Sequence, residues 1–236
     1  ASEMQREGGG AGAMDGALTA GALATTYTSS QGVLLMIPNM YRISGELQPC
    51  VMHIVSRTLA THALNIFGDH SDIMAVKQTG WSILCSDSSQ AAHDFAIVSH
   101  IATLDTSVPI VHFFEGFRTS HEISKVELLG YDKIREIFPM ELAEKHRMNK
   151  LHPQFPTIQA NSHPGSAFFQ AAEASNKFYD AVPEKLQYWM DKVGEVTGRK
   201  YKFFDYEGVK EPDHVIVIMG SGGHTVGQYV AAHPGE

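Results

Sequence analysis

Short, almost continuous apolar runs alternate with longer segments of helical spacing, and this alternation limits the possible fold more than any other feature. Three such runs are clear, at residues 51–56, 81–86 and 108–114. A helical stripe of apolar residues lies between the last two, at residues 88–104. Apolar strands that alternate with helices are typical of a parallel sheet covered on both faces. We therefore predict an α/β fold with a mainly parallel sheet and helices on both faces.

The remaining segments extend the same pattern. Residues 24–29 are β-branched and aromatic, which favours a strand. Pro38 is interpreted as lying near a helix start and Gly198 as a C-cap. Three prolines within residues 151–165 predict an irregular connection. Further helices are expected at residues 33–47, 61–66, 167–179 and 184–197.

Residues 8–23 are almost all glycine, alanine or other small residues. Each glycine in a helix interior costs up to about 1 kcal/mol relative to alanine. Such a segment is favourable where backbones pack closely or a ligand lies against it, so we predict a buried helix. Glu7 at its start has two interpretations. Spacing alone favours a carboxylate that interacts with the helix dipole, and the alternative is a buried carboxylate that faces a ligand.

The last part of the chain reads as a new unit. A polar break at residues 207–213 precedes residues 214–219, which form the clearest candidate for a buried strand. The Gly-Ser-Gly-Gly sequence at residues 220–223 lacks the full pattern of a dinucleotide-binding loop, so we interpret it as a tight turn before a helix near residue 226. We place a domain boundary near residue 205. Residues 1–205 would form one domain and residues 206–236 the start of a second α/β domain.

Composition excludes several classes of protein. The chain has 18 basic and 26 acidic residues, a formal charge of -8 that does not suit nucleic-acid binding. Its two cysteines, Cys50 and Cys85, exclude a disulfide scaffold and a four-cysteine iron–sulfur site within this chain, and they read as buried, inert thiols. No apolar run reaches 18 residues, so no membrane span is expected. The 13 histidines include no HExxH pair, and no metal site is expected.

Polar side chains follow two of the predicted strands. Arg57 comes directly after residues 51–56, and open α/β sheets place ligands beyond the carboxyl ends of their strands. Its guanidinium suits a small carboxylate, although a structural ion pair is the more common role at such a position. Glu115, Arg118 and Glu122 follow another strand. We interpret Arg118, with Glu115 or Glu122, as part of an interface or loop-fixing network and not as catalytic machinery.

Several long motifs stand out in the sequence. The first is Glu-Met-Gln-Arg-Glu-Gly-Gly-Gly-Ala-Gly-Ala at residues 3–13. The others lie at residues 29–41, 66–70, 78–80, 112–122, 197–199 and 204–206. Together they closely resemble the pyruvate:ferredoxin (flavodoxin) oxidoreductase family. The resemblance runs from residue 1 to about 146 and resumes at about 168. Pyruvate:NADP oxidoreductases share the same portion.

The resemblance implies a transketolase-like, thiamine diphosphate-binding fold and the oxidative decarboxylation of pyruvate to acetyl-CoA and CO₂. Glu7 matches the family's catalytic glutamate, which contacts the ring nitrogen of the cofactor's aminopyrimidine, and Gly8 belongs to the same cofactor-binding motif. Arg57 matches the arginine that binds the substrate carboxylate. The implied partners are pyruvate, coenzyme A, ferredoxin or flavodoxin, and a second copy of the full-length chain.

Some family features are missing from this sequence. A Gly-Asp-Gly motif for diphosphate and Mg²⁺ does not occur, nor do the cysteines of the [4Fe-4S] clusters. Asp15 and Cys50 replace the usual His and Gly, and residues 147–167 diverge most. We therefore expect an excised fragment, truncated at its N-terminus and inactive in isolation. The alternative is a stand-alone, non-catalytic binding or scaffold subunit. The expected compartment is the cytoplasm, or a hydrogenosome or mitochondrion-related organelle in a eukaryote.

Overall fold

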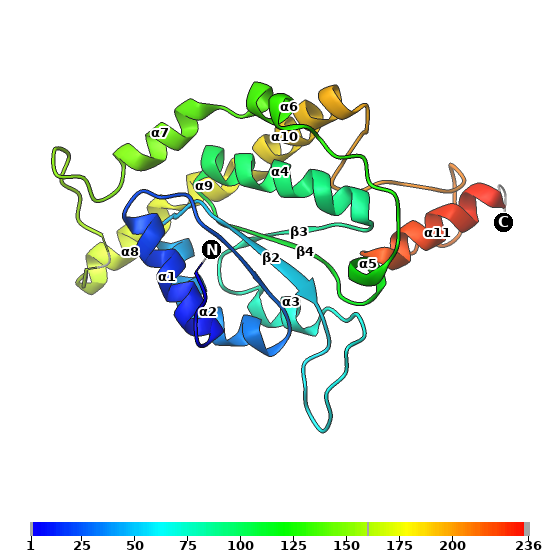
Figure 1. The fold of residues 1–236 in the computed structure, drawn as a ribbon, viewed down its shortest axis with the longest axis horizontal. Coiled ribbons are helices and arrows are strands. Elements are labelled where there is room, and N and C mark those ends of the chain that lie inside the picture. The colour runs from blue at the N-terminus through cyan, green and yellow to red at the C-terminus, as the bar shows by residue number, and fades with distance from the viewer. Residues whose placement is uncertain (1, 160, 234–236) are drawn as a thin grey trace.

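A four-stranded parallel sheet forms the centre of the computed structural model, which describes residues 2–159 and 161–233 (Figure 1). The order across the sheet is β1-β2-β4-β3, and every neighbouring pair is parallel. The carboxyl ends of the strands therefore share one edge of the sheet. The predicted α/β fold with a mainly parallel sheet is confirmed. The strands are β1 (Thr25–Thr28), β2 (Val51–Ser56), β3 (Ser82–Cys85) and β4 (Ile110–Glu115).

Helices cover both faces of the sheet, as predicted. On one face α1 (Glu7–Thr19), α2 (Gln31–Gly45) and α3 (Ser71–Val76) pack in a core that includes Met52, Ile54 and Phe113. On the other face α4 (Ser89–Thr106) and α10 (Val182–Thr197) pack against Leu84 and Ile110 (Figure 1). Successive strand residues point to opposite faces, so β4 contributes to both cores. Burial on both faces explains why β2 and β4 consist mostly of apolar residues.

The other helices lie in the long connections. The predicted irregular connection is confirmed, because residues 151–159 and 161–164 contain only an isolated bridge between His152 and Phe155. The helix expected at residues 167–179 is divided into two short helices. Gly198 has φ +76° and caps α10, as predicted. These helices are α5 (Arg118–His121), α6 (Tyr131–Ile137), α7 (Met140–Met148), α8 (Gly165–Ala174), α9 (Asn176–Asp180) and α11 (Ser221–Ala232).

Two local predictions about helices are wrong. Residues 61–66 form an exposed loop, because Leu64 and Ile66 have no core to face, and the helix forms later, as α3. Pro38 lies in the interior of α2 and not near its start. Its side chain is on the exposed side of that helix, where the ring meets solvent and not the core.

The small-residue helix is present as α1, but it is buried on one side only. Its buried residues are Ala11, Met14, Asp15 and Leu18, whose spacing places them on one face of the helix. Gly9 and the other small residues of the opposite face are exposed. The predicted helix is therefore confirmed, but its burial is confirmed for one face only.

The predicted buried strand at residues 214–219 is not a strand in the described part of the chain. Ile216 and Val217 are 76% and 87% exposed, and no described strand pairs with this segment. An apolar segment becomes a buried strand only when a neighbour accepts its backbone hydrogen bonds and covers its side chains. The turn at Gly220 is present with φ +75°, and α11 begins directly after it at Ser221.

Candidate functional site

Glu7 and Arg57 lie at the same edge of the sheet, where the parallel strands end. Arg57 directly follows β2, and β1 is the neighbour of β2. The chain leaves β1 through a turn to Gly32, and Glu7 lies against that glycine. A Cβ added to Gly32 would stand 2.6 Å from Oγ1 of Thr28 and 2.9 Å from Cγ of Glu7. The absence of a side chain at Gly32 thus lets Glu7 approach the end of β1.

The Glu7 carboxylate is exposed and available to a ligand. It is the first residue of α1 and therefore also interacts with the helix dipole, as one interpretation of the sequence expects. Within the described residues it has no hydrogen bond or ion pair. The expectation of a buried carboxylate is wrong for this structure, because the side chain lies at the exposed start of the helix.

Gly8 brings α1 close to α2. A Cβ added to Gly8 would lie 3.2 Å from the carbonyl oxygen of Leu35, and the side-chain amide of Asn39 donates to the Gly8 carbonyl at 3.2 Å. Gly9 and Gly10 behave differently, since a Cβ added to either meets nothing within 4 Å. The structure thus gives Gly8 a packing role and leaves open space over the glycines that follow.

Arg57 has a half-buried side chain that forms no ion pair within the described residues. Its Nε is buried and has no hydrogen-bond partner there. The side chain lies over Gly116, where an added Cβ would stand 2.5 Å from Cγ and 2.8 Å from Nε of Arg57. The structural ion pair weighed from the sequence is therefore absent from the described residues, and the guanidinium can take an external anion.

Asp72 connects the ends of β1 and β2, and sequence reasoning missed it. One oxygen of its fully buried carboxylate accepts hydrogen bonds from the backbone N–H groups of Ser30 and Arg57, at 2.9 and 3.0 Å. Its other oxygen lies 2.6 Å from the hydroxyl of Ser56. Its only signal in the sequence is its place at the end of the polar stretch at residues 67–72.

Glu115 at the end of β4 joins three separate segments. Its carboxylate pairs with Nε2 of His70 at 3.1 Å and accepts from the hydroxyl of Ser221 at the start of α11. The carboxylate stands between the imidazole and the hydroxyl, so the imidazole cannot activate the hydroxyl as the base of a nucleophilic triad does. The expected loop-fixing role of Glu115 is supported, but its partners are His70 and Ser221 and not Arg118.

Three histidines form a hydrogen-bonded chain under α4. Nδ1 of His53 lies 2.9 Å from Nδ1 of His112, and Nε2 of His53 lies 3.3 Å from Nε2 of His100. Nε2 of His112 lies 2.7 Å from the hydroxyl of Ser86. The ring nitrogens pair with each other and do not converge on one point. No group of three metal-ligating side chains suited to an ion occurs within the described residues.

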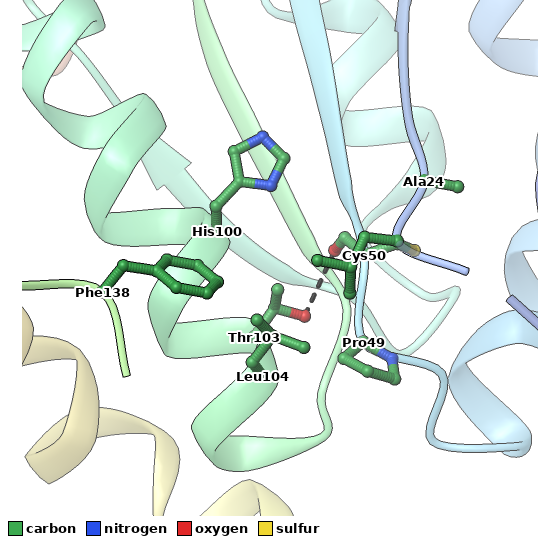
Figure 2. Close-up of a pocket in the computed structure, with 8 residues that line it drawn as sticks. Ala24, Pro49, Cys50, His100, Thr103, Leu104 and Phe138 are labelled. Atoms are coloured by element: carbon green, nitrogen blue, oxygen red, sulfur yellow. Dashed lines mark hydrogen bonds between the residues drawn. The ribbon is translucent and has the colours of Figure 1, made fainter. Parts of the chain in front are cut away.

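A small cavity of about 110 Å³ lies at the opposite end of the sheet (Figure 2). His100, Thr103 and Leu104 of α4 face Pro49 and Cys50, which precede β2. The Thr103 hydroxyl donates to the Cys50 carbonyl at 3.3 Å, the bond drawn in Figure 2. Arg57 follows the other end of β2, so this cavity is separate from the candidate site.

Both cysteines have raised pKa values because they are buried. The pKa of Cys50 lies well above the usual range, and that of Cys85 is raised to about 12. Cys50 is fully buried, whereas Cys85 is partly exposed. The prediction of buried, inert thiols fits Cys50 fully and Cys85 in part.

Among the described helices, none combines the length and apolar character needed to cross a lipid bilayer.

Comparison with known proteins identifies the family. Residues 1–191 match the family described as pyruvate flavodoxin/ferredoxin oxidoreductase, thiamine diphosphate-binding. The chain is 52% identical to the pyruvate-flavodoxin oxidoreductase of Nostoc sp. over 97% of its length, which is 19% of that protein. It is 51% identical to the mitochondrial pyruvate dehydrogenase [NADP(+)] of Euglena gracilis, covering 97% of this chain and 13% of that protein. The chain thus spans a fifth or less of these relatives.

A solved structure supports the fold. The 2-oxoglutarate:ferredoxin oxidoreductase of Magnetococcus marinus matches 98% of this chain and 43% of its own, with a TM-score of 0.59 and 16% sequence identity. At that identity the match concerns the fold only. Together with the family match over residues 1–191, it confirms the resemblance found in the sequence motifs. The chain belongs to the thiamine diphosphate-binding family of pyruvate flavodoxin/ferredoxin oxidoreductases.

Proposed function

We propose that this chain is the aminopyrimidine-binding part of a pyruvate oxidoreductase that converts pyruvate to acetyl-CoA and CO₂. The observation that carries the proposal is that a carboxylate and a guanidinium, each without a bonding partner in the described part of the chain, lie at the same edge of the sheet. Glu7 offers a carboxylate without a partner, and Arg57 offers a guanidinium without a counterion, among the described residues. The first suits a nitrogen heterocycle and the second suits a 2-oxoacid.

The surroundings of Glu7 fit an aminopyrimidine. The open backbone at Gly9 and Gly10 leaves room for a flat ring beside the carboxylate. A carboxyl group that hydrogen-bonds to a ring nitrogen favours the imino tautomer of an aminopyrimidine. Thiamine diphosphate, when bound, supplies a carbon nucleophile for the 2-oxo group of the substrate. Glu7 would be the catalytic residue of this chain, and Gly8 would set the position of the backbone beside it.

Arg57 would bind the carboxylate of pyruvate. A guanidinium offers parallel N–H donors that match a carboxylate, and a half-buried position strengthens that pairing. Gly116 fixes the direction of the side chain by leaving space for its Cγ and Nε. The substrate would thus be held at the carboxyl edge of the sheet, next to the segment that Glu7 contacts.

The rest of the activity requires groups that these residues do not provide. We assign residues 1–205 to the pyrimidine-binding domain and residues 206–236 to the start of a transketolase C-terminal-like domain. Mg²⁺, the cofactor diphosphate and [4Fe-4S] clusters would be held by other parts of a longer, homodimeric protein. Ferredoxin or flavodoxin would accept the electrons, with NADP⁺ as the alternative indicated by the Euglena relative, and coenzyme A would accept the acetyl group. The proposed compartment is the cytoplasm, or a mitochondrion-related organelle.

The role of Glu7 is tested in the natural full-length protein. Glu7→Gln and Glu7→Ala should lower pyruvate-dependent electron transfer at least about 100-fold, as expected for loss of an acid–base group. Absorbance of the iron–sulfur clusters should stay unchanged. Glu3→Gln removes another exposed carboxylate of the same motif and serves as the matched control. Turnover of the Glu7 variants within a few-fold of the wild type would refute the assignment.

The role of Arg57 is tested by the split between KM and kcat. Arg57→Leu should raise KM for pyruvate about 100-fold or more, because hydrogen bonds between charged groups each contribute about 1.5–3 kcal/mol. Arg135→Leu is the control, since Arg135 is exposed on α6 and pairs only with exposed Asp132 among the described residues. An unchanged KM in the Arg57 variant would remove the proposed substrate contact.

A further inference from the structure

Asp72 is a fully buried carboxylate whose partners are all neutral hydrogen-bond donors. Its Oδ2 accepts from the backbone N–H groups of Ser30 and Arg57. Its Oδ1 accepts from the backbone N–H of Ile73 at 2.8 Å and lies 2.6 Å from the hydroxyl of Ser56. No ion pair involves Asp72 within the described residues. Burying a carboxylate without a cation is costly, so these hydrogen bonds must compensate for the lost hydration.

The two bonds to Oδ2 connect the segments that carry the candidate site. Ser30 lies in the turn between β1 and α2, two residues before the glycine that contacts Glu7. Arg57 is the first residue after β2. A single oxygen atom therefore holds both segments at a fixed separation. Ser30 also has φ +48°, a conformation that costs a non-glycine residue of the order of 1 kcal/mol, and the bond to Asp72 stabilises it.

We propose that Asp72 is a positioning residue that sets the location of Arg57 relative to Glu7, and thus the location of the substrate carboxylate relative to the cofactor. This inference rests on the proposed roles of Glu7 and Arg57. Asp72 touches neither substrate nor cofactor in this scheme and acts through the backbone of its two partners. A displacement of about 1 Å at a reacting centre can lower the rate about 100-fold, so such a constraint has a measurable effect.

Two substitutions distinguish the effect of where the acceptor oxygen lies from the effect of its charge. In Asp72→Asn, the amide oxygen can still accept from the backbone N–H groups of Ser30 and Arg57, while the amide nitrogen donates to the Ser56 hydroxyl, which in turn donates to the Asp69 carbonyl. The bond from the Ile73 N–H is lost, because that N–H then faces another donor. Asp72→Glu keeps the negative charge but moves the carboxylate outward by one methylene group. Both variants retain a polar side chain at this position, and the bond from Ile73 that Asp72→Asn loses joins neither of the two segments.

The test compares kcat/KM for pyruvate in the natural full-length protein. Positioning predicts that Asp72→Asn stays within about threefold of the wild type, and that Asp72→Glu lowers kcat/KM at least about tenfold, mainly through KM. An electrostatic role predicts the opposite order. The opposite order, or equal values for the two variants, would overturn the inference.

A matched control addresses simple destabilisation. Ser56→Ala removes a hydrogen bond to Oδ1 but leaves both bonds to Oδ2 in place. It should lower the midpoint of thermal unfolding while KM for pyruvate stays within about twofold. A rise in KM equal to that of Asp72→Glu would mean that general packing, and not the link between the two segments, controls the site.

A failure of the positioning role of Asp72 can be distinguished from a failure of the proposed substrate contact of Arg57. In a protein that already carries Arg57→Leu, Asp72→Glu should raise KM no further, because the side chain that it positions is absent. A further rise of tenfold or more would overturn the inference. If Arg57→Leu alone leaves KM unchanged, the proposed substrate contact fails. If Arg57→Leu raises KM but Asp72→Glu does not, only the positioning role fails.

Discussion

The buried histidine chain predicts that acid destabilises this fold well above the pH at which most carboxylates are protonated. Burial, reinforced by the neighbouring histidines, lowers the pKa of His53 to about 4 and that of His112 to about 3. Burial also lowers the pKa of His100. His53 and His112 are therefore neutral in the folded chain at pH 5, whereas a histidine in an unfolded chain has a pKa near 6.5. The perturbation is therefore a change from pH 7 to pH 5.

The sign and size of the change in the free energy of unfolding follow from proton linkage. Below pH 6.5 the unfolded chain binds protons that the folded chain excludes, so stability falls as the pH falls towards the folded-state pKa values. At pH 5 each histidine lies 1.5 units below its unfolded pKa, which corresponds to about 2 kcal/mol. His53 and His112 together should therefore lower the free energy of unfolding by about 4 kcal/mol. The raised pKa of Asp15 acts in the opposite direction at lower pH and is common to all variants compared.

Urea unfolding at the two pH values measures this effect. Trp81 and Trp189 are buried in the two cores on opposite faces of the sheet, so their fluorescence reports both. A variant with both His53→Gln and His112→Gln should lose about 4 kcal/mol less than the wild type between pH 7 and pH 5. His62→Gln, at an exposed loop, should leave the difference unchanged. Equal losses in the wild type and the double variant would refute the reasoning.

Three further predictions test other parts of the structure. Arg199→Leu should lower the free energy of unfolding by about 3–5 kcal/mol in urea titrations, because Asp94 is fully buried and accepts from Arg199 at 2.5 and 3.0 Å. A change below about 1 kcal/mol would contradict this. Gly116→Ala should raise KM for pyruvate at least about tenfold in steady-state kinetics, because the added Cβ displaces Arg57; an unaltered KM would show that the side chain adapts. Cys50 should resist thiol reagents at pH 8 until urea is added, as peptide mass spectrometry can show, because burial raises its pKa; labelling of the native protein would contradict this.

The central fold could be predicted because burial on two faces leaves a clear local pattern. Residues 51–56 are mostly apolar, apart from His53 and Ser56, and they form the buried strand β2. The stripe at residues 88–104 forms α4 for the same reason. Residues 61–66 and 214–219 carry similar apolar patterns but are exposed. Their outcome depends on whether another element covers them, and a local pattern does not contain that information.

The candidate site could be predicted only in part. Arg57 was found because a strand end marks the ligand edge of a parallel sheet, and the roles of Glu7 and Arg57 came from the resemblance to a family. Asp72 was not predicted, because its partners Ser30, Ser56 and Arg57 lie 42, 16 and 15 residues away in the chain. The link between His53 and His112 spans 59 residues. Hydrogen bonds between residues so far apart in the chain produce no periodic pattern in the sequence, because they depend on how the strands are ordered in the sheet.

The distribution of charge at the sheet edge explains why an anion belongs there. Asp72 directs its carboxylate to backbone N–H groups, including that of Arg57, and Glu115 is occupied by His70 and Ser221. Within the described residues, neither carboxylate therefore neutralises the Arg57 guanidinium. By contrast, the charge of Arg199 is already neutralised by two carboxylates, those of Asp94 and Glu127. A half-buried guanidinium with an unpaired Nε gains most from a carboxylate that arrives from outside, which is the property required of a binding residue for a 2-oxoacid.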